Sequence, residues 1–370
     1  MAITRLGPNQ DITAAKIAGQ INFKNLIING DMSIAQRGTS ATGKTTDGYY
    51  TLDRYQFAIT SLGTWTFTQS TDVPSGQGFG YSQKADCTTA DASPSASDRI
   101  FYRQKFEGQN LQYLKKGTSS AESLTLSFWV KSNKTGTYIV ELFDHDNSRH
   151  ISKSYTVSSA STWEKKTITI EGDTTGAFTN DNNLSLHVAW WLGAGSTYTS
   201  GTLGTSWGSQ TNANRAVGQV NLADNTANEW YITGVQLEAD TSASDFEFLP
   251  YDVNLQRCKR YFQILGDNKS GTANEPIVNA SNYNGTYTTG AYLFNPVMRT
   301  APTITSVSGT DYYGFVANSQ SDNANSLSGT QTSNRSTQLF NNGDISGTAG
   351  QAGYWETKNN SAKVTADAEL

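Results

Sequence analysis

The sequence predicts an all-β fold of the sandwich or jelly-roll type, and three observations support this prediction. Apolar and polar residues alternate with a period of two through most of the interior of the chain, which places one set of side chains against a core and the other toward water. Clusters of Gly, Asn, Asp and Ser separate the alternating segments. Only 16% of the 370 residues are charged while 11% are aromatic, and the abundant Ser, Thr, Asn and Gly favour turns and short strands over helices. Many short antiparallel strands with long polar loops are typical of sandwiches and jelly rolls.

The first 25 residues follow a different pattern. Apolar residues recur there at i, i+3, i+4 and i+7, and Asp11 or Thr13 is placed to cap a helix. A helix this short is marginal alone, and Gly19 weakens it further, so its apolar stripe needs a partner: the same chain, a symmetry mate or a docking socket. We therefore expect residues 1–25 to form an attachment arm. The stripe comprises Ala14, Ile17, Ala18 and Ile21.

Residues 26–252 carry the clearest alternation and are expected to form the main β-sandwich domain. Trp190 shares a strand face with Leu186 and Val188 and is expected in the core, whereas Trp191 lies on the opposite face. The strands expected in this domain are 124–130, 138–143, 167–170, 184–192, 217–222 and 230–237.

A second boundary is expected near Pro250, so that residues 253–370 form a smaller C-terminal β domain. The segment 322–342 is so polar that we expect it to be largely surface loop. The strands expected in this domain are 292–294, 303–307 and a last one within 363–370.

Charge and hydropathy exclude several classes of protein. Lys+Arg 27 against Asp+Glu 32 give a net charge of −5, which argues against a protein that binds a nucleic acid backbone. No apolar run approaches the roughly 20 residues of a membrane-spanning helix, and the N-terminus lacks the apolar region of a signal peptide. We therefore expect a soluble protein that neither inserts into a membrane nor is exported. Cys87 and Cys258 fit neither a disulfide framework nor a zinc site and are expected to be buried free thiols.

Three short motifs match functional patterns but lack the context that those patterns require. Residues 38–45 fit the P-loop pattern, yet glycine and aromatic residues follow where a helix must propagate. Residues 204–208 fit the G-x-S-x-G pattern, but all three histidines precede the serine, whereas the hydrolase fold places its histidine after it. Residues 144–149 begin like a calcium loop without its glycine, and a hairpin turn explains them better. We therefore expect no catalytic residue, no metal and no cofactor.

Seven stretches spread over most of the chain match one kind of protein. They are residues 25–38 (NLIINGDMSIAQRG), 52–55 (LDRY), 127–132 (SFWVKS), 163–176 (WEKKT leading to GDTTG), 230–238 (WYITGVQLE), 257–262 (RCKRYF) and 296–304 (PVMRTAPTI). In these stretches the sequence resembles tail-fibre and virion-appendage proteins of tailed bacteriophages, particularly of phages that infect marine cyanobacteria and related hosts. The resemblance indicates a virion module, but it specifies less well where on the particle that module is attached.

The resemblance implies an all-β chain with a short N-terminal arm, a jelly-roll sandwich similar to carbohydrate-binding modules and a smaller C-terminal β domain. It implies a homotrimer located on the virion, assembled in the cytoplasm of the bacterial host, and no established catalytic residue. Only about 25 residues precede the module, which suggests a short fibre or compact appendage whose arm docks on a tail, portal or adaptor, or capsid protein. Attachment to the tail and attachment to the capsid both stay open.

A polar β surface with aromatic residues suits a host-surface polysaccharide, because aromatic faces stack on the C–H surfaces of sugars while short polar side chains bond to hydroxyls. Trp191 is a candidate from strand parity, and the other candidates are aromatics expected in loops. A trimer would multiply a weak affinity per site. The candidate glycan-binding residues are Trp191, Tyr198, Trp207, Tyr312, Tyr313, Tyr354 and Trp355.

Two other functions stay open beside receptor binding. A purely structural fibre, head decoration or connector would bind only virion proteins. A polysaccharide depolymerase, which we rank third, would need two carboxylates that face each other across a glycosidic bond, and the scattered Asp and Glu residues do not show whether such a pair exists.

Overall fold

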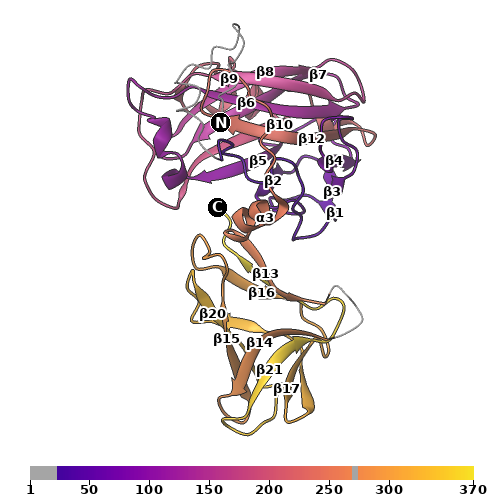
Figure 1. Cartoon of the computed structure of the whole chain (residues 1–370). Helices are drawn as coiled ribbons and strands as arrows, with labels where there is room; N and C mark the ends of the chain where they lie inside the picture. The colour runs from indigo at the N-terminus through magenta and orange to yellow at the C-terminus, as the bar shows by residue number, and fades with distance from the viewer. Residues whose placement is uncertain (1–22, 269–273) are drawn as a thin grey trace, which may run out of the picture.

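The computed structural model describes residues 23–268 and 274–370 and consists of two β units joined through a short helix (Figure 1). The larger unit contains two packed sheets, and the smaller one, drawn in orange and yellow, extends away from it. The C-terminus returns to the junction beside the connecting helix. Among the described helices, none has the length and apolar character needed to cross a membrane.

Two six-stranded antiparallel sheets form the larger unit, a jelly-roll sandwich, as predicted. Sheet A has the order β1-β3-β4-β12-β6-β9, and sheet B has the order β11-β8-β7-β10-β5-β2. Sheet A comprises β1 (Ser40–Lys44), β3 (Thr64–Ser70), β4 (Ser82–Thr89), β6 (Leu124–Ser132), β9 (Glu164–Ile170) and β12 (Glu229–Glu238). Sheet B comprises β2 (Tyr55–Thr60), β5 (Arg99–Glu107), β7 (Gly136–Asp144), β8 (Arg149–Val157), β10 (Leu184–Ala194) and β11 (Gly208–Ser209).

The sandwich core lies between the two sheets and consists of alternate residues of each strand. Leu126, Phe128 and Val130 of β6 are buried, as are Val188 and Trp190 of β10. The rings of Phe128 and Trp190 meet edge to face, with centroids 5.7 Å apart, a geometry that the charge distribution of aromatic rings favours. The core position predicted for Trp190 is confirmed, and so are the two buried free thiols.

Short helical turns connect the strands, and one longer helix leaves the sandwich. Asn254 of that helix is buried; its side chain accepts from the Asn29 backbone N–H (3.1 Å) and donates to the Asp31 carboxylate (3.0 Å). The helix is thereby fixed against the sandwich. These elements are η1 (Gly108–Asn110), η2 (Gln112–Leu114), α2 (Ser196–Thr199), η3 (Asn212–Asn214), η4 (Leu222–Asp224) and the connecting helix α3 (Tyr251–Lys259).

The smaller unit contains a three-stranded sheet, in the order β13-β22-β16, and a seven-stranded sheet, in the order β18-β17-β21-β14-β15-β20-β19. Its separate core includes Phe315, Leu339 and Trp355. The first sheet comprises β13 (Phe262–Asp267), β16 (Thr303–Ser306) and β22 (Lys363–Asp367). The second comprises β14 (Glu275–Asn282), β15 (Tyr287–Leu293), β17 (Tyr313–Ala317), β18 (Gln320–Ala324), β19 (Ser328–Thr330), β20 (Ser336–Asn342) and β21 (Ala352–Thr357).

Buried ion pairs join the end of the chain to the sandwich. The Glu369 carboxylate pairs with Arg54 and lies 3.5 Å from the Arg37 guanidinium, and these three side chains are at most 8% exposed. The Arg299 guanidinium donates to the Asn182 carbonyl oxygen of the sandwich (2.9 Å) and to the Ala368 carbonyl oxygen (2.7 Å). The orientation of the two units therefore depends on polar contacts, and the ion pairs of Glu369 among them are buried.

Two of the predicted local structures are wrong. Residues 217–222 do not form a strand, because Gly218 adopts a positive φ of 88° and Asn221 caps η4. Residues 322–342 are not largely loop: β20 pairs along its whole length with β15, and its alternate residues Thr337, Leu339 and Asn341 are buried. High polarity concealed a period of two in this segment.

The three doubtful motifs have ordinary structural roles. Residues 40–44 of the P-loop match form β1, and residues 144–149 form the predicted hairpin turn between β7 and β8. Residues 204–208 lead into the short edge strand β11. The apolar stripe Ala14, Ile17, Ala18 and Ile21 of the predicted arm lies outside the described residues.

Candidate functional site

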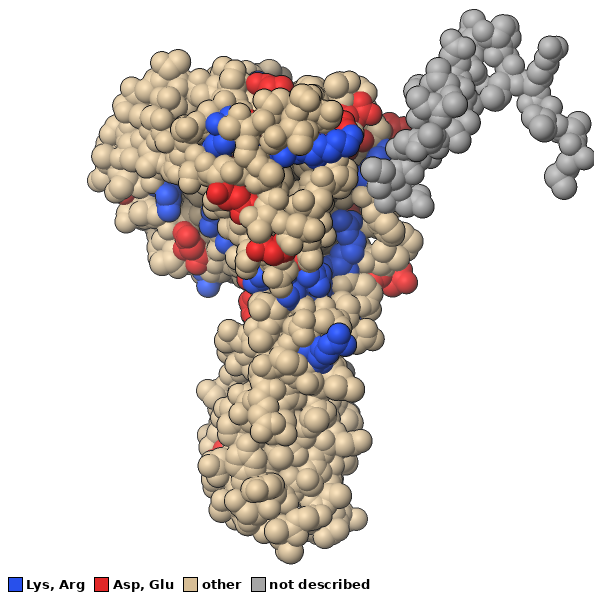
Figure 2. All heavy atoms as spheres, turned by 90° about the vertical axis from the view of Figure 1, so that its left-hand side faces the viewer, with Lys and Arg blue, Asp and Glu red and all other residues tan. Residues whose placement is uncertain are grey.

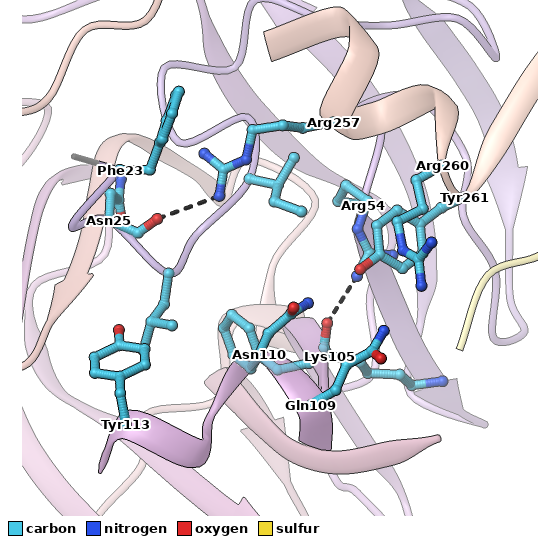
Figure 3. Close-up of a pocket in the computed structure, with 13 residues that line it drawn as sticks. Phe23, Asn25, Arg54, Lys105, Gln109, Asn110, Tyr113, Arg257, Arg260 and Tyr261 are labelled. Carbon is cyan, nitrogen blue, oxygen red and sulfur yellow. Dashed lines mark hydrogen bonds between the residues drawn. The ribbon is translucent and has the colours of Figure 1, made fainter. Parts of the chain in front are cut away.

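A cavity of about 500 Å³ lies at the junction between the sandwich and α3. We call it the junction cavity. Its walls come from the segment around Asn25, from Arg54, from the end of β5 with η1 and η2, and from the segment between α3 and Tyr261 (Figure 3). Its volume is within the range that small ligands occupy in proteins. Figure 2 shows that Lys and Arg gather at the base of the sandwich just above the narrow junction, whereas the visible face of the smaller unit carries few charges.

Apolar and aromatic groups form one part of the cavity wall. Leu26, Ile28 and Phe106 line it. Tyr113 of η2 is 37% exposed and Phe23 is 53% exposed. Burial raises the pKa of Tyr113 to about 12, so its hydroxyl keeps its proton at neutral pH and can donate a hydrogen bond.

Polar groups form the rest of the wall. Gln109 and Asn110 of η1 are exposed at the cavity, and the Gln109 amide donates to the Glu107 carboxylate at 2.6 Å. Figure 3 shows Tyr113 and Asn110 on one side of the space and Asn25 and Arg257 on the other. The cavity thus presents hydrogen-bonding groups on opposite sides of one space.

Four cationic side chains and no acidic one are among the described residues that line the cavity. Arg260 pairs with both oxygens of Glu107, at 2.8 and 2.7 Å. Burial opposes ionisation of Glu107, but the hydrogen bonds from Arg260 and Tyr261 outweigh it and hold the pKa of Glu107 below its usual value. Arg54 pairs with Glu369 and stacks on the Tyr261 ring. The charges of Arg54 and Arg260 are therefore compensated.

The other two cations, Lys105 and Arg257, form no ion pair with an Asp or Glu side chain of the described residues. Burial, together with the neighbouring charge of Arg103, lowers the pKa of Lys105 to about 8, and its ammonium donates to the main-chain oxygen of Leu370. Arg257 donates to the Asn25 carbonyl oxygen at 3.3 Å. Burial lowers the pKa of Arg257, and no ion pair to it occurs within residues 23–268 and 274–370.

The outer face of sheet B around Trp191 is not open to a ligand, because residues 195–216 cover it. We call these residues the strap. Tyr198 of the strap packs on Trp191, with ring centroids 5.3 Å apart, and Trp191 is 0% and Tyr198 7% exposed. Arg215 of the strap forms two bonds to Glu141, at 2.6 and 2.9 Å. Strand parity placed Trp191 on the correct face, but the prediction that Trp191 and Tyr198 are accessible to a glycan is wrong, because the strap buries both.

Two further candidates, Tyr313 and Trp355, are also buried, at 0% exposure. They lie in β17 and β21 and not in loops, and both belong to the core of the smaller unit. As surface contacts for a glycan these two predictions are wrong, because the strands that carry them were not recognised in the sequence.

The remaining candidates are half-buried, and the structure does not bring them together. Trp207 donates to the Glu171 carbonyl oxygen at 2.8 Å, and Tyr312 packs against the core of the smaller unit. Tyr354 lines a groove of about 440 Å³ on that unit with Pro276 and Val278. A glycan-binding role for Trp207, Tyr312 and Tyr354 stays a prediction.

Sequence reasoning missed an aromatic groove of about 320 Å³ on sheet A. Trp129 and Phe248 line it, and Phe248 is 51% exposed. Phe248 stands against Phe79 and Phe246, with ring centroids 5.2 and 4.8 Å away. The sequence signal was the pair of phenylalanines just before Pro250, in a segment that otherwise resembles a linker.

The junction cavity was also missed, because its residues come from segments that are distant in sequence. A weak signal existed in the mixture of basic and aromatic residues over 257–262. Within the described part of the chain, no cluster of three or more His, Cys, Asp or Glu side chains is arranged to hold a metal ion.

Comparison with known proteins yields likeness in fold alone. The sequence matches no protein-family profile and no curated protein sequence. The enzymatically active domain of tailspike protein 4 of bacteriophage CBA120 is similar to 59% of this chain, with a TM-score of 0.31 and 13% identity, and this chain covers 22% of that one. A putative sugar binding protein from Bacteroides thetaiotaomicron is similar over 58% of this chain and 100% of its own, with a TM-score of 0.30 and 13% identity.

A family 11 carbohydrate-binding module of a Clostridium thermocellum cellulase is similar over 55% of this chain and 98% of its own length, with a TM-score of 0.25 and 13% identity. At these identities the likeness concerns the β-sandwich architecture and not the ligand.

Proposed function

We propose that this chain is a subunit of a phage virion appendage, a short tail fibre, that binds a saccharide of the host surface in the junction cavity. The cavity itself carries the proposal. It combines a volume of about 500 Å³ with an apolar wall, a partly exposed tyrosine ring and amide and guanidinium groups around one space (Figure 3). Sugars present apolar C–H faces and hydroxyl edges together, and this combination of wall groups suits both.

The elements that carry the wall are anchored, which supports binding without a large ordering cost. Leu111 and Leu114, which flank and end η2, are buried in the sandwich core. Cys258 anchors α3 at 0% exposure. The exposed side chains of η1 and η2 therefore project from a fixed backbone.

In this proposal residues 1–25 attach the subunit to a tail, portal or capsid protein, and three copies assemble on the particle. The resemblance of the sequence to virion appendages supports this part. Three linked sites raise the effective concentration of each site for a repetitive polysaccharide, so a weak affinity per site is sufficient. The proposal assigns the chain adhesion and not catalysis.

Binding of the purified, assembled protein to host cells and to arrays of bacterial polysaccharides tests the proposal. The double variant Asn110→Ala/Tyr113→Ala is expected to bind at least about tenfold more weakly, because it loses a ring and two hydrogen-bonding groups. Two matched aromatic variants probe the other grooves: Phe248→Ala on sheet A and Tyr354→Ala on the smaller unit. Both are expected to bind like the unmodified protein.

Three results would overturn the proposal in different ways. Loss of binding in Phe248→Ala or Tyr354→Ala, with binding retained in the double variant, would move the site to another groove. Absence of saccharide binding in a protein that is still incorporated into particles would indicate a structural connector. Release of oligosaccharides from host envelope would indicate a depolymerase.

A further inference from the structure

We propose that the saccharide in the junction cavity carries an anionic group, a carboxylate or a phosphate, which is bound by Arg257. This inference rests on the proposed function and specifies the class of ligand. It follows from the charges around the cavity, the fixed position of Arg257 and the groups on the opposite wall.

The charges leave an excess of positive groups at the cavity. Glu369 compensates Arg54, and Glu107 compensates Arg260. Arg257 has no carboxylate partner within the described residues, and its one hydrogen bond runs to a backbone carbonyl. A guanidinium has five N–H donors, so Arg257 retains donors for a ligand.

Asn25 holds the Arg257 guanidinium in position. The Asn25 side chain donates to the Val235 carbonyl oxygen (3.0 Å) and accepts from the Leu237 backbone N–H (3.0 Å), both in β12. The Asn25 carbonyl that accepts from Arg257 is therefore fixed to the sandwich. A guanidinium held at its stem and at one nitrogen is prepared for a planar carboxylate or a phosphate, which it can bind through two parallel bonds.

Burial lowers the pKa of Arg257 and outweighs the nearby charge of Glu247, which favours the ionised form of Arg257. A partly buried guanidinium without a directly paired carboxylate loses hydration and gains little in exchange. An anionic ligand supplies this paired charge at a partly buried guanidinium, where the attraction exceeds that at a fully exposed one. A neutral sugar would leave this cost unchanged.

The opposite wall indicates a saccharide and not a free inorganic ion. Asn110 and Tyr113 lie across the space from Arg257 (Figure 3), and Leu26 and Ile28 add apolar surface. A free phosphate would not fill a cavity of about 500 Å³, and it has no apolar surface that could contact the apolar wall. A sugar ring between Tyr113 and Arg257 uses both sides of the cavity.

The test measures binding of the assembled full chain to pairs of bacterial polysaccharides, each spotted in its native acidic form and in its carboxyl-reduced form. Mannose 6-phosphate and mannose, measured by calorimetry, form a second pair that distinguishes phosphate from carboxylate. We expect at least about tenfold tighter binding of the acidic member in at least one of the two classes, and a weakening of that binding as NaCl is raised.

Arg257→Gln is expected to remove the preference for the acidic member, and Arg257→Lys to retain part of it. Arg335→Gln is the matched control, because Arg335 is an exposed arginine of the smaller unit and its removal changes the net charge equally. Circular dichroism establishes that each variant is folded.

The outcomes separate the inference from the proposed function. Equal binding of the acidic and neutral members of every pair would overturn the anionic ligand while leaving saccharide binding in place. Equal loss of preference in Arg257→Gln and Arg335→Gln would overturn the role of Arg257. Binding of neither member of any pair would contradict the proposed function itself.

Discussion

At the scale of one residue, Glu141 is a fully buried carboxylate whose charge is stabilised by neighbouring side chains. The side chain is 0% exposed and accepts from Arg215 and from the Trp191 indole (3.2 Å), with His150 at 3.4 Å. Burial alone would favour the protonated acid, but Arg215 and His150 outweigh it and hold the pKa of Glu141 below its usual value. The carboxylate is therefore charged at neutral pH and depends on its partners.

Removing Arg215 is expected to destabilise the protein strongly. Arg215→Met leaves Glu141 buried without its main counter-charge, and we expect the free energy of unfolding in urea to fall by about 3–5 kcal/mol. The double variant Glu141→Leu/Arg215→Met is expected to regain much of this loss. Arg335→Met serves as the exposed control, and a loss below about 1 kcal/mol in Arg215→Met would contradict the prediction.

Two neighbouring histidines, His187 of β10 and His145 in the turn after β7, are kept neutral. His145 Nε2 and His187 Nδ1 are 2.8 Å apart. Burial and the charge of Arg103 lower the pKa of His145 to about 4 and that of His187 well below its usual value. In the unfolded chain both histidines have an ordinary pKa near 6.5.

Stability is therefore expected to fall as the pH decreases from about 6.5 toward 4. In this window the unfolded chain binds protons that the folded protein does not, so the free energy of unfolding decreases by up to about 1.4 kcal/mol per pH unit for each histidine. His145→Gln/His187→Gln should flatten the curve of urea midpoint against pH in this window. A variant that shows the same slope as the unmodified protein would refute the assignment.

At the scale of elements, the strap determines what sheet B can do. Its residues 195–216 convert the outer face of the sheet from an open surface into a second small core with Ala58, Phe101 and Ile139. The Tyr198 hydroxyl accepts from Arg99 at 2.9 Å, so the strap is held by polar as well as apolar contacts. The junction cavity, at the end of the same sheet, stays open.

Shortening the side chain of Tyr198 in the strap is expected to expose Trp191. Tyr198→Ala removes a buried ring, and we expect a loss of about 3 kcal/mol in the free energy of unfolding and stronger quenching of tryptophan fluorescence by acrylamide. Tyr283→Ala is the matched control, since Tyr283 is 75% exposed. Unchanged quenching in Tyr198→Ala would show that other parts of the strap suffice to cover Trp191.

At the scale of the whole molecule, the junction couples the sandwich to the smaller unit. Glu369 reaches two arginines of the sandwich, and Lys363 donates to the Gln36 carbonyl oxygen at 2.9 Å. Glu107 of the sandwich binds Arg260 and Tyr261 at the start of the smaller unit. Each unit also has its own core. Whether the two units unfold together or independently therefore depends on these contacts.

Neutralising Glu369 is expected to uncouple the two units. Glu369→Gln leaves Arg54, 1% exposed, without its counter-charge, and buried charges left in this way typically cost about 3–5 kcal/mol. Calorimetry should then resolve two thermal transitions, and small-angle scattering should report a larger radius of gyration. Glu122→Gln, which alters an exposed pair with Lys115, should change neither, and one unchanged transition in Glu369→Gln would contradict the coupling.

The sequence by itself determined the fold class, because a period of two in hydropathy is a local property that survives in any arrangement of strands. The predicted strands 124–130, 138–143, 184–192 and 230–237 lie within β6, β7, β10 and β12. The side of β10 that carries Trp190 could be predicted in the same way. The structures of the segments 217–222 and 322–342 could not be predicted in this way. In the first, Gly218 with its positive φ interrupts a strand-like pattern. In the second, the buried face of the strand includes the polar residues Thr337 and Asn341, so the average composition resembled that of a loop.

Only the tertiary structure decided which surfaces are free. Whether Trp191, Tyr198, Tyr313 and Trp355 face water depends on the strap and on sheet pairing, which join residues far apart in the chain. The junction cavity brings together segments near residues 25, 110 and 257. A local sequence pattern tells which face of a strand a side chain occupies. The accessibility of that side chain and the net charge around a site depend on residues that are distant in sequence. The packing of the whole chain determines which of these residues lie nearby.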